Sequence, residues 1–234
     1  MLSLPQAASA RTVDAVSGRP LLHVQEDSTV WVHLAPLIYV SRAPEPALDA
    51  SQLDLIRAIL DAARKYNLLS VTECMRRVLK SPDIVAAKPV SVYALACVHG
   101  LEDVARVGAR QSLSEPLGTD YVEELDLISV RTFHKLTTYR SKCVAAALKA
   151  VSAWYKEGSS DKLSVPKNCN YCKRVERDGR TTRGSWAIYM ERLERSLEQT
   201  PHATKARSTS LLWSVTTSLE REVKEAIDKV ALEF

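Results

Sequence analysis

Cys169 and Cys172 are the residues whose type and spacing could do chemistry most directly. Two thiolates at Cys-x-x-Cys spacing can hold one edge of a zinc ion, but a structural zinc site uses four ligands. The chain has no second pair of this spacing, and His202 is its only histidine downstream of the pair. Three interpretations stay open: a zinc half-site, two unliganded thiols and a redox pair. We expect unliganded thiols, no tightly held zinc and no cofactor.

Basic side chains follow the cysteine pair closely. Glu176 and Asp178 interrupt them, and Tyr171 is the only aromatic residue close by. Proteins that bind single-stranded nucleic acid usually combine a basic groove with aromatic stacking residues. We therefore interpret the segment as a solvated loop, in a chain whose net charge is only +4. Its basic residues are Lys173, Arg174, Arg177, Arg180 and Arg183.

The motifs of common enzyme classes are missing from the sequence. It contains no Gly-x-x-x-x-Gly-Lys-Ser/Thr loop, no Gly-x-Gly-x-x-Gly, no Gly-x-Ser-x-Gly elbow and no His-Glu-x-x-His. Cys74, Cys97 and Cys143 fall on apolar helical faces, where a cysteine is usually a small core residue. We therefore expect that the protein is not an enzyme, and we nominate no catalytic residue.

The composition is that of an ordinary globular protein. Of the 234 residues, 46% are hydrophobic and 26% charged, and only 7 are glycine. No apolar run approaches the roughly eighteen residues of a membrane helix, and no signal peptide is visible. Five cysteines at irregular spacing do not form a disulfide framework. We expect an intracellular protein, of the cytoplasm or nucleus, without membrane contact.

A hairpin of two amphipathic helices, residues 53–67 and 71–80, is the clearest pattern in the chain. From Leu53 onward, apolar residues recur at the spacing of one helical face. The second helix carries a matching apolar face. We expect the side chains of Leu60 and Tyr66 to be buried between this hairpin and the helices that follow it.

Capping residues mark the ends of several predicted helices. Ser51 with Asp54, and Ser70 with Glu73, stand where the N-terminal caps of the two hairpin helices are expected. Gly100 is predicted to end a later helix, because glycine adopts the left-handed conformation of such a cap without strain.

Other helices are predicted on both sides of the hairpin. A short helix precedes it through Leu34, and small residues around Gly108 would let another helix approach closely. A polar linker follows Lys156 and separates off the C-terminal tail. We divide the chain into residues 1–80, the helical residues 81–157 and a basic, helical tail of residues 158–234.

Several short segments occur in an order and spacing that resemble one family. They are residues 37–39, 62–66, 92–96 and 100–105, Tyr139–Arg140, Cys143 and residues 230–234. Together they resemble the second half of a BTB/POZ domain and the helices behind it, as found in BTB proteins abundant in mushroom-forming (basidiomycete) fungi. The resemblance implies a mainly α-helical protein: the C-terminal half of a BTB/POZ fold with at most one or two strands, and a helical extension.

A complete BTB domain begins with strands and a helix that this sequence lacks before Met1. Only residues 21–24 are a strand candidate, so the resemblance implies an N-terminally truncated BTB domain in residues 1–80. The apolar faces of the hairpin would then lack part of their cover, and we expect oligomers or aggregates. The apolar residues concerned are Leu53, Ile56, Leu60, Val71, Met75 and Val78.

BTB domains are protein–protein interaction modules, so the resemblance implies homotypic association or an adaptor role. Some BTB proteins dock the cullin scaffold of a ubiquitin ligase through a hydrophobic-x-Glu motif and a tyrosine on the next helix. Leu4, Gln6 and Tyr39 occupy comparable places, although Gln6 replaces the acidic residue. The alternative function is a small zinc- or nucleic-acid-binding module in residues 158–234.

Overall fold

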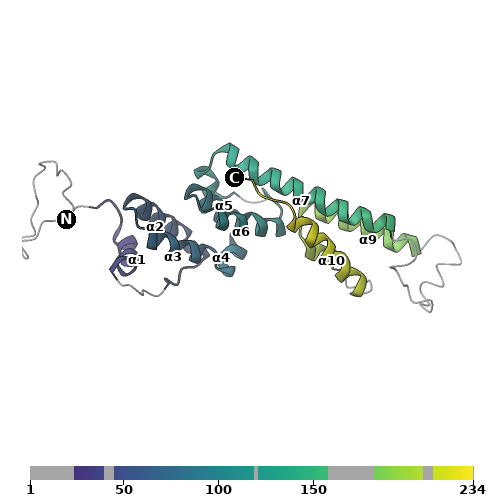
Figure 1. The fold of residues 1–234 in the computed structure, drawn as a ribbon, viewed down its shortest axis with the longest axis horizontal. Coiled ribbons are helices and arrows are strands. Elements are labelled where there is room, and N and C mark those ends of the chain that lie inside the picture. Colours follow the sequence, from purple (N-terminus) through teal and green to yellow (C-terminus); the bar gives the residue numbers. More distant parts are fainter. Residues whose placement is uncertain (1–23, 40–44, 119–120, 158–181, 208–212, 234) are drawn as a thin grey trace, which may run out of the picture.

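The structure, a computed structural model, describes residues 24–39, 45–118, 121–157, 182–207 and 213–233. These residues are mainly helical and contain no β-strand, which confirms the prediction of a mainly α-helical protein. Of the predicted strand at residues 21–24, only Val24 is described, and it lies outside any helix or strand. Figure 1 shows an elongated arrangement, with α1–α3 at one end, α4–α6 in the middle and α7, α9 and α10 at the other end.

The predicted hairpin is present as α2, Leu53–Lys65, and α3, Leu69–Leu79. Its caps differ from those predicted from the sequence. Asp49 caps the short 3-10 helix η1, Ala50–Gln52, by accepting a hydrogen bond from the backbone N–H of Ser51 at 2.7 Å. This 3-10 turn leads directly into α2, which moves the cap two residues upstream of Ser51.

The second predicted cap is also wrong. Helix α3 begins after Leu68 without any side-chain cap. Glu73, expected to bind the backbone in a capping box with Ser70, instead accepts a hydrogen bond from the Arg76 guanidinium at 2.9 Å. An ion pair along the helix surface has replaced the cap, since both arrangements use the same carboxylate.

Helix α1, Ser28–Tyr39, covers the hairpin by packing against both α2 and α3. Val30 and Leu34 of α1 are buried in the same apolar cluster as the hairpin side chains. The expectation that the hairpin exposes apolar surface is therefore wrong: its apolar residues have exposed fractions of 6% or less. They are Leu53, Ile56, Leu60, Val71, Met75 and Val78.

Three short helices continue the core behind the hairpin: α4, Pro82–Ala87, α5, Pro89–Val98, and α6, Glu102–Gln111. Helix α5 is buried nearly all round, as the central helix of this layer must be. Between α5 and α6, Gly100 has the positive φ of +69° that was predicted for a left-handed cap.

The close approach of α5 and α6 depends on Gly108. A Cβ atom built on this glycine would lie 2.8 Å from the backbone nitrogen of Tyr93 and 2.9 Å from the carbonyl oxygen of Pro89. Both contacts are to backbone atoms, which cannot rotate away. The sequence-based prediction that small residues admit a neighbouring helix here is confirmed.

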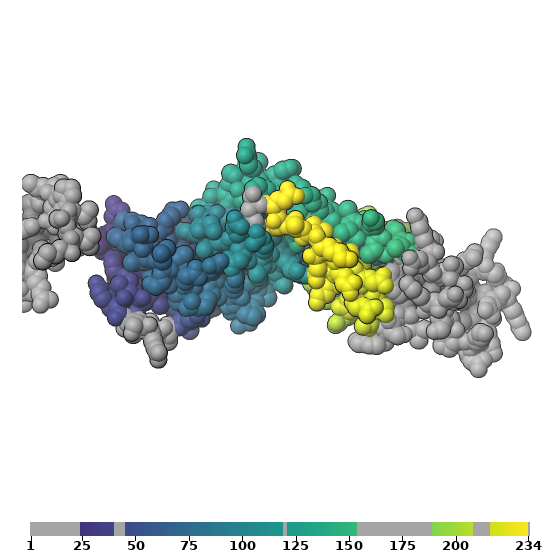
Figure 2. All heavy atoms as spheres, in the orientation of Figure 1, coloured from purple at the N-terminus to yellow at the C-terminus, as the bar shows by residue number. Residues whose placement is uncertain are grey.

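A long helix, α7, Val130–Glu157, joins this block to the C-terminal helices. Helices α9, Thr182–Gln199, and α10, Trp213–Asp228, pack along α7, and Figure 2 shows the yellow atoms of α10 against the green atoms of α7. The 3-10 helix η4, Ala203–Ala206, connects them. The last described residues return to α7, where the Lys142 Nζ donates to Glu233 Oε1 at 2.7 Å.

Arg140 of α7 links the segment that follows α6 to the end of α9. Its guanidinium is buried and donates to the carbonyl oxygens of Ser112, Glu115 and Gln199, the first at 2.7 Å. Burial lowers the pKa of this guanidinium below its usual value. Carbonyl oxygens at the ends of two helical segments carry partial negative charge, so they stabilise the cation without a carboxylate.

Candidate functional site

The outer side of α1 is the most unusual surface of the described protein. Helix α1 contains no Asp, Glu, Lys or Arg, although it lies at the molecular surface. Val32 is 68% exposed and Tyr39 is 83% exposed, while Val30 and Leu34 on the inner side are buried. Pro36, one turn from each, is also exposed, so these three residues form one apolar stripe at helical spacing. We call Val32, Pro36 and Tyr39 the α1 stripe.

The position of α1 is fixed by contacts at its N-terminal end. The rings of Trp31 and Tyr66 pack together with their centroids 6.0 Å apart. Glu26, just before α1, accepts a hydrogen bond from Lys65 Nζ at 2.7 Å and another from the Tyr66 hydroxyl at 2.7 Å. These two bonds, from Lys65 first, lower the pKa of the Glu26 carboxyl to about 2. The α1 stripe is therefore presented on an anchored helix.

The side chain of Tyr66 does not lie where we predicted it from the sequence. We expected its ring between the hairpin and the helices that follow, but it is only partly buried and packs against the preceding helix α1. Leu60, by contrast, is 1% exposed as predicted. The difference arises because Tyr66 caps the end of α2 and points to the side that α1 covers.

The residues predicted to contact partners are only partly described. Tyr39 is 83% exposed at the end of α1. Leu4 and Gln6 lie outside the described residues, and so do Cys169 and Cys172. Within the part of the chain that is described, no three His, Cys, Asp or Glu side chains are grouped so that they could hold a metal ion.

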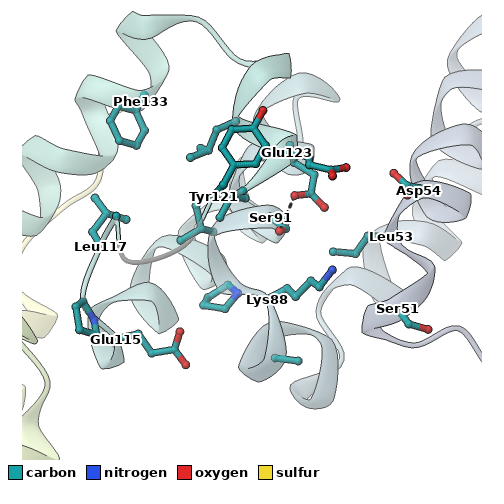
Figure 3. Close-up of a pocket in the computed structure, with 18 residues that line it drawn as sticks. Ser51, Leu53, Asp54, Lys88, Ser91, Glu115, Leu117, Tyr121, Glu123 and Phe133 are labelled. Atoms are coloured by element: carbon teal, nitrogen blue, oxygen red, sulfur yellow. Dashed lines mark hydrogen bonds between the residues drawn. The ribbon is translucent and has the colours of Figure 1, made fainter.

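A second candidate site is a cavity of about 440 Å³ between the start of α2, the junction of α4 and α5, and the loop that enters α7. Figure 3 shows Leu53 and Asp54 on one wall, Tyr121 and Glu123 on another, and Lys88 between them. Apolar side chains such as Leu117 and Phe133 complete the lining.

One carboxylate of this cavity, that of Glu124, is positioned by a hydrogen bond from a buried serine. Ser91 is 4% exposed, and its hydroxyl donates to Glu124 Oε2 at 2.8 Å (Figure 3). Glu124 belongs to the 3-10 helix η3, Glu123–Leu127, which packs on α5. We did not predict this site from the sequence, although the acidic run from Glu123 to Asp126 was a visible signal.

The three described cysteines are poor nucleophiles. Cys74 and Cys143 are buried and Cys97 is partly buried, and burial raises the pKa of each thiol. A thiol whose pKa is raised stays protonated near neutral pH, whereas the thiolate is the reactive form. Their placement agrees with the prediction that they are core residues.

No protein-family model, curated protein or solved structure matches the chain. A function for the protein must therefore be inferred from the geometry of its own residues. Among the described helices, none combines the length and apolar character needed to cross a membrane.

Proposed function

We propose that this chain is a protein–protein interaction module that associates with a second copy of itself through the α1 stripe. The observation that carries the proposal is the exposure of Val32 and Tyr39 on a helix without charged side chains. The resemblance to BTB proteins, which are interaction modules that can associate homotypically, supports a function in protein–protein interaction.

The chemistry of the α1 stripe favours a second copy as its partner. An uncharged apolar strip is complementary to an identical strip, and a two-fold axis brings the same residues of both chains together. The centres of protein interfaces are depleted of charge, and tyrosine is enriched among the residues that contribute most binding energy. Anchoring of α1 through Glu26 and Tyr66 limits the entropy lost on association.

Sedimentation velocity over a range of concentrations tests this function. We expect the wild-type chain to associate, and Val32→Glu to associate more weakly because it would bury a charge at the contact. Val130→Glu is the matched control, since Val130 is 85% exposed at the start of α7. A wild-type chain that stays monomeric at all concentrations would contradict the proposal, as would equal loss of association in both variants.

A cullin adaptor is the second candidate, and the exposure of Tyr39 favours it. This function predicts that a cullin N-terminal domain binds the immobilised chain and that Tyr39→Ala weakens the binding. The control is Tyr121→Ala, because Tyr121 is also strongly exposed, at 75%, but lies in the cavity lining. Absence of cullin binding by the wild-type chain would exclude this candidate and leave the self-association untouched.

A further inference from the structure

The cavity beside Ser91 carries a charge opposite to that of the whole chain. Four carboxylates and one ammonium group line it, a net charge of −3, whereas the chain has a net charge of +4. These residues are Asp54, Glu115, Glu123, Glu124 and Lys88. The cavity therefore concentrates negative charge on a protein that is otherwise basic.

The carboxylates of the cavity form no ion pair with any residue that the structure describes. Elsewhere on the described surface, carboxylates such as Asp103 and Asp228 pair with arginine or lysine side chains. Among the described residues, the neutral Ser91 hydroxyl is the one side chain that donates a hydrogen bond to Glu124. Clustered, unpaired carboxylates beside a recess attract a cationic ligand.

The lining also has an apolar component, which a small inorganic cation would not use. Leu53 is buried, and Leu117, Leu125 and Phe133 are partly buried around the same space. A cavity with apolar walls and an acidic rim is complementary to a peptide that carries both apolar and basic side chains. Tyr121, 75% exposed at the rim, adds an aromatic surface for arginine side chains.

We propose that this cavity binds the basic segment, residues 167–180, of a second copy of the chain. The segment contains five basic and two acidic residues, a net charge of +3 that balances the net −3 of the lining. Tyr171 and Val175 lie among the basic residues and supply apolar groups for the cavity walls. The proposal rests on the association of copies proposed above and adds a second contact surface, because no α1 residue lines this cavity.

The length of α7 argues for a second copy rather than the same chain. Phe133 at the cavity lies in the first turn of α7, and the segment begins beyond Glu157 at its other end. At 1.5 Å per residue the separation is about 36 Å. A segment tethered at residues 157 and 182 must run out and back, so its middle reaches about 40 Å only when the chain is nearly fully extended. Binding between copies avoids this restriction.

The test is a fluorescence anisotropy titration of the full chain into a labelled synthetic peptide of residues 167–180, with its cysteines kept reduced. We expect saturable binding that weakens with added salt and that falls at least about tenfold in Glu123→Lys and Glu115→Lys. Glu198→Lys is the matched control: it makes the same charge change at an exposed residue of α9 and should bind like the wild type.

A scrambled peptide of the same composition separates a specific site from general charge attraction. We expect it to bind at least about tenfold more weakly than the native sequence. Equal binding of both peptides, no binding of the native one, or equal loss in Glu198→Lys would overturn the proposal, once circular dichroism shows that each variant is folded. The titration uses a free peptide and therefore reports on the cavity alone. Peptide binding can be absent while the sedimentation test supports the α1 stripe, and peptide binding can be present while the sedimentation test contradicts the α1 stripe.

Discussion

The hairpin α2–α3 and the helix α1 are both rich in apolar residues, but they bury them to different degrees. The hairpin side chains that face inward are closed off completely, with exposed fractions of 6% or less. Helix α1 closes that core with Val30 and Leu34 and leaves Val32 and Tyr39 in solvent. The described residues thus close this core without a partner, and α1 keeps two strongly exposed apolar side chains on a helix that has no charged residue.

The hairpin and α1 also differ in the charged residues on their outer faces. The outer faces of α2 and α3 carry ion pairs, such as Arg64 with Asp61 and Arg76 with Glu73. Such exposed pairs add little to stability, but they keep a surface hydrated. The surface of α1 has none, because the helix contains no charged residue. This difference is why we propose a role in recognition for α1 and a role in stability for the hairpin.

The largest expected effect on stability comes from truncating a buried side chain of the hairpin. Leu60→Ala should lower the free energy of unfolding by about 2–5 kcal/mol, since it removes a fully buried side chain and leaves a cavity. Chemical denaturation followed by circular dichroism measures this. Leu69→Ala is the control, because Leu69 is 72% exposed and should cost below about 0.5 kcal/mol. Similar losses in both variants would remove the distinction between buried and exposed hairpin residues.

A somewhat smaller effect is expected where α5 meets α6. Gly108→Ala would place a methyl group against the backbone of Tyr93 and Pro89, and overpacking of this kind costs about 1–3 kcal/mol. Val107→Ala on the same helix is the control, since Val107 is partly exposed and alanine favours a helix. The same denaturation experiment measures both variants. A Gly108→Ala protein as stable as the wild type would show that the two helices can separate without cost.

His99, which follows the last residue of α5, should make the folding stability of the protein sensitive to acid. Its side chain is 3% exposed, and its Nε2 has no hydrogen-bond partner among the described residues, with Asp61 Oδ1 4.0 Å away. Burial lowers the pKa of His99, opposed by Asp61 and assisted by Arg64 and Arg57. The unfolded chain therefore takes up this proton first, near pH 6.5, so stability is full above that pH and falls as the pH decreases.

The measurement for His99 is the free energy of unfolding at pH 7.5 and pH 5.5, values that bracket the ordinary histidine pKa of about 6.5. We expect the wild type to lose stability on acidification and His99→Gln to lose less. His202, whose pKa burial also lowers, should account for part of the remaining loss. The low pKa of Glu26 acts only at more acidic pH, below about 4.5. An identical loss in wild type and His99→Gln would show that His99 is protonated without penalty.

The sequence predicted what depends on local periodicity. The helices of the hairpin, the cap at Gly100 and the close approach at Gly108 all follow from residue spacing or size, and the structure contains each of them. The caps at Ser51 and Ser70 were wrong, because nearby residues offered competing partners: Gln52 for Asp49, and Arg76 for Glu73.

Features that depend on packing between distant segments could not be predicted in the same way. Cover of the hairpin by α1, the burial of Arg140 and the cavity around Ser91 each join segments far apart in sequence. An arginine within a helical pattern is normally a surface residue, and only the three carbonyl oxygens that surround Arg140 explain its burial. Tyr39 was nominated by resemblance, and its exposure could not be deduced from its spacing alone.

The most direct measurement of the central claim is photo-crosslinking from the α1 stripe. The chain is prepared with p-benzoylphenylalanine at position 32 and, as a control, at position 130, since Val32 and Val130 are both strongly exposed. Irradiation at micromolar concentration should give a covalent dimer from position 32, with the crosslink mapped by mass spectrometry to α1 of the other copy. Position 130 should give little dimer. Equal crosslinking from both positions, or a crosslink from position 32 to a segment other than α1, would contradict the proposal that copies associate through the α1 stripe.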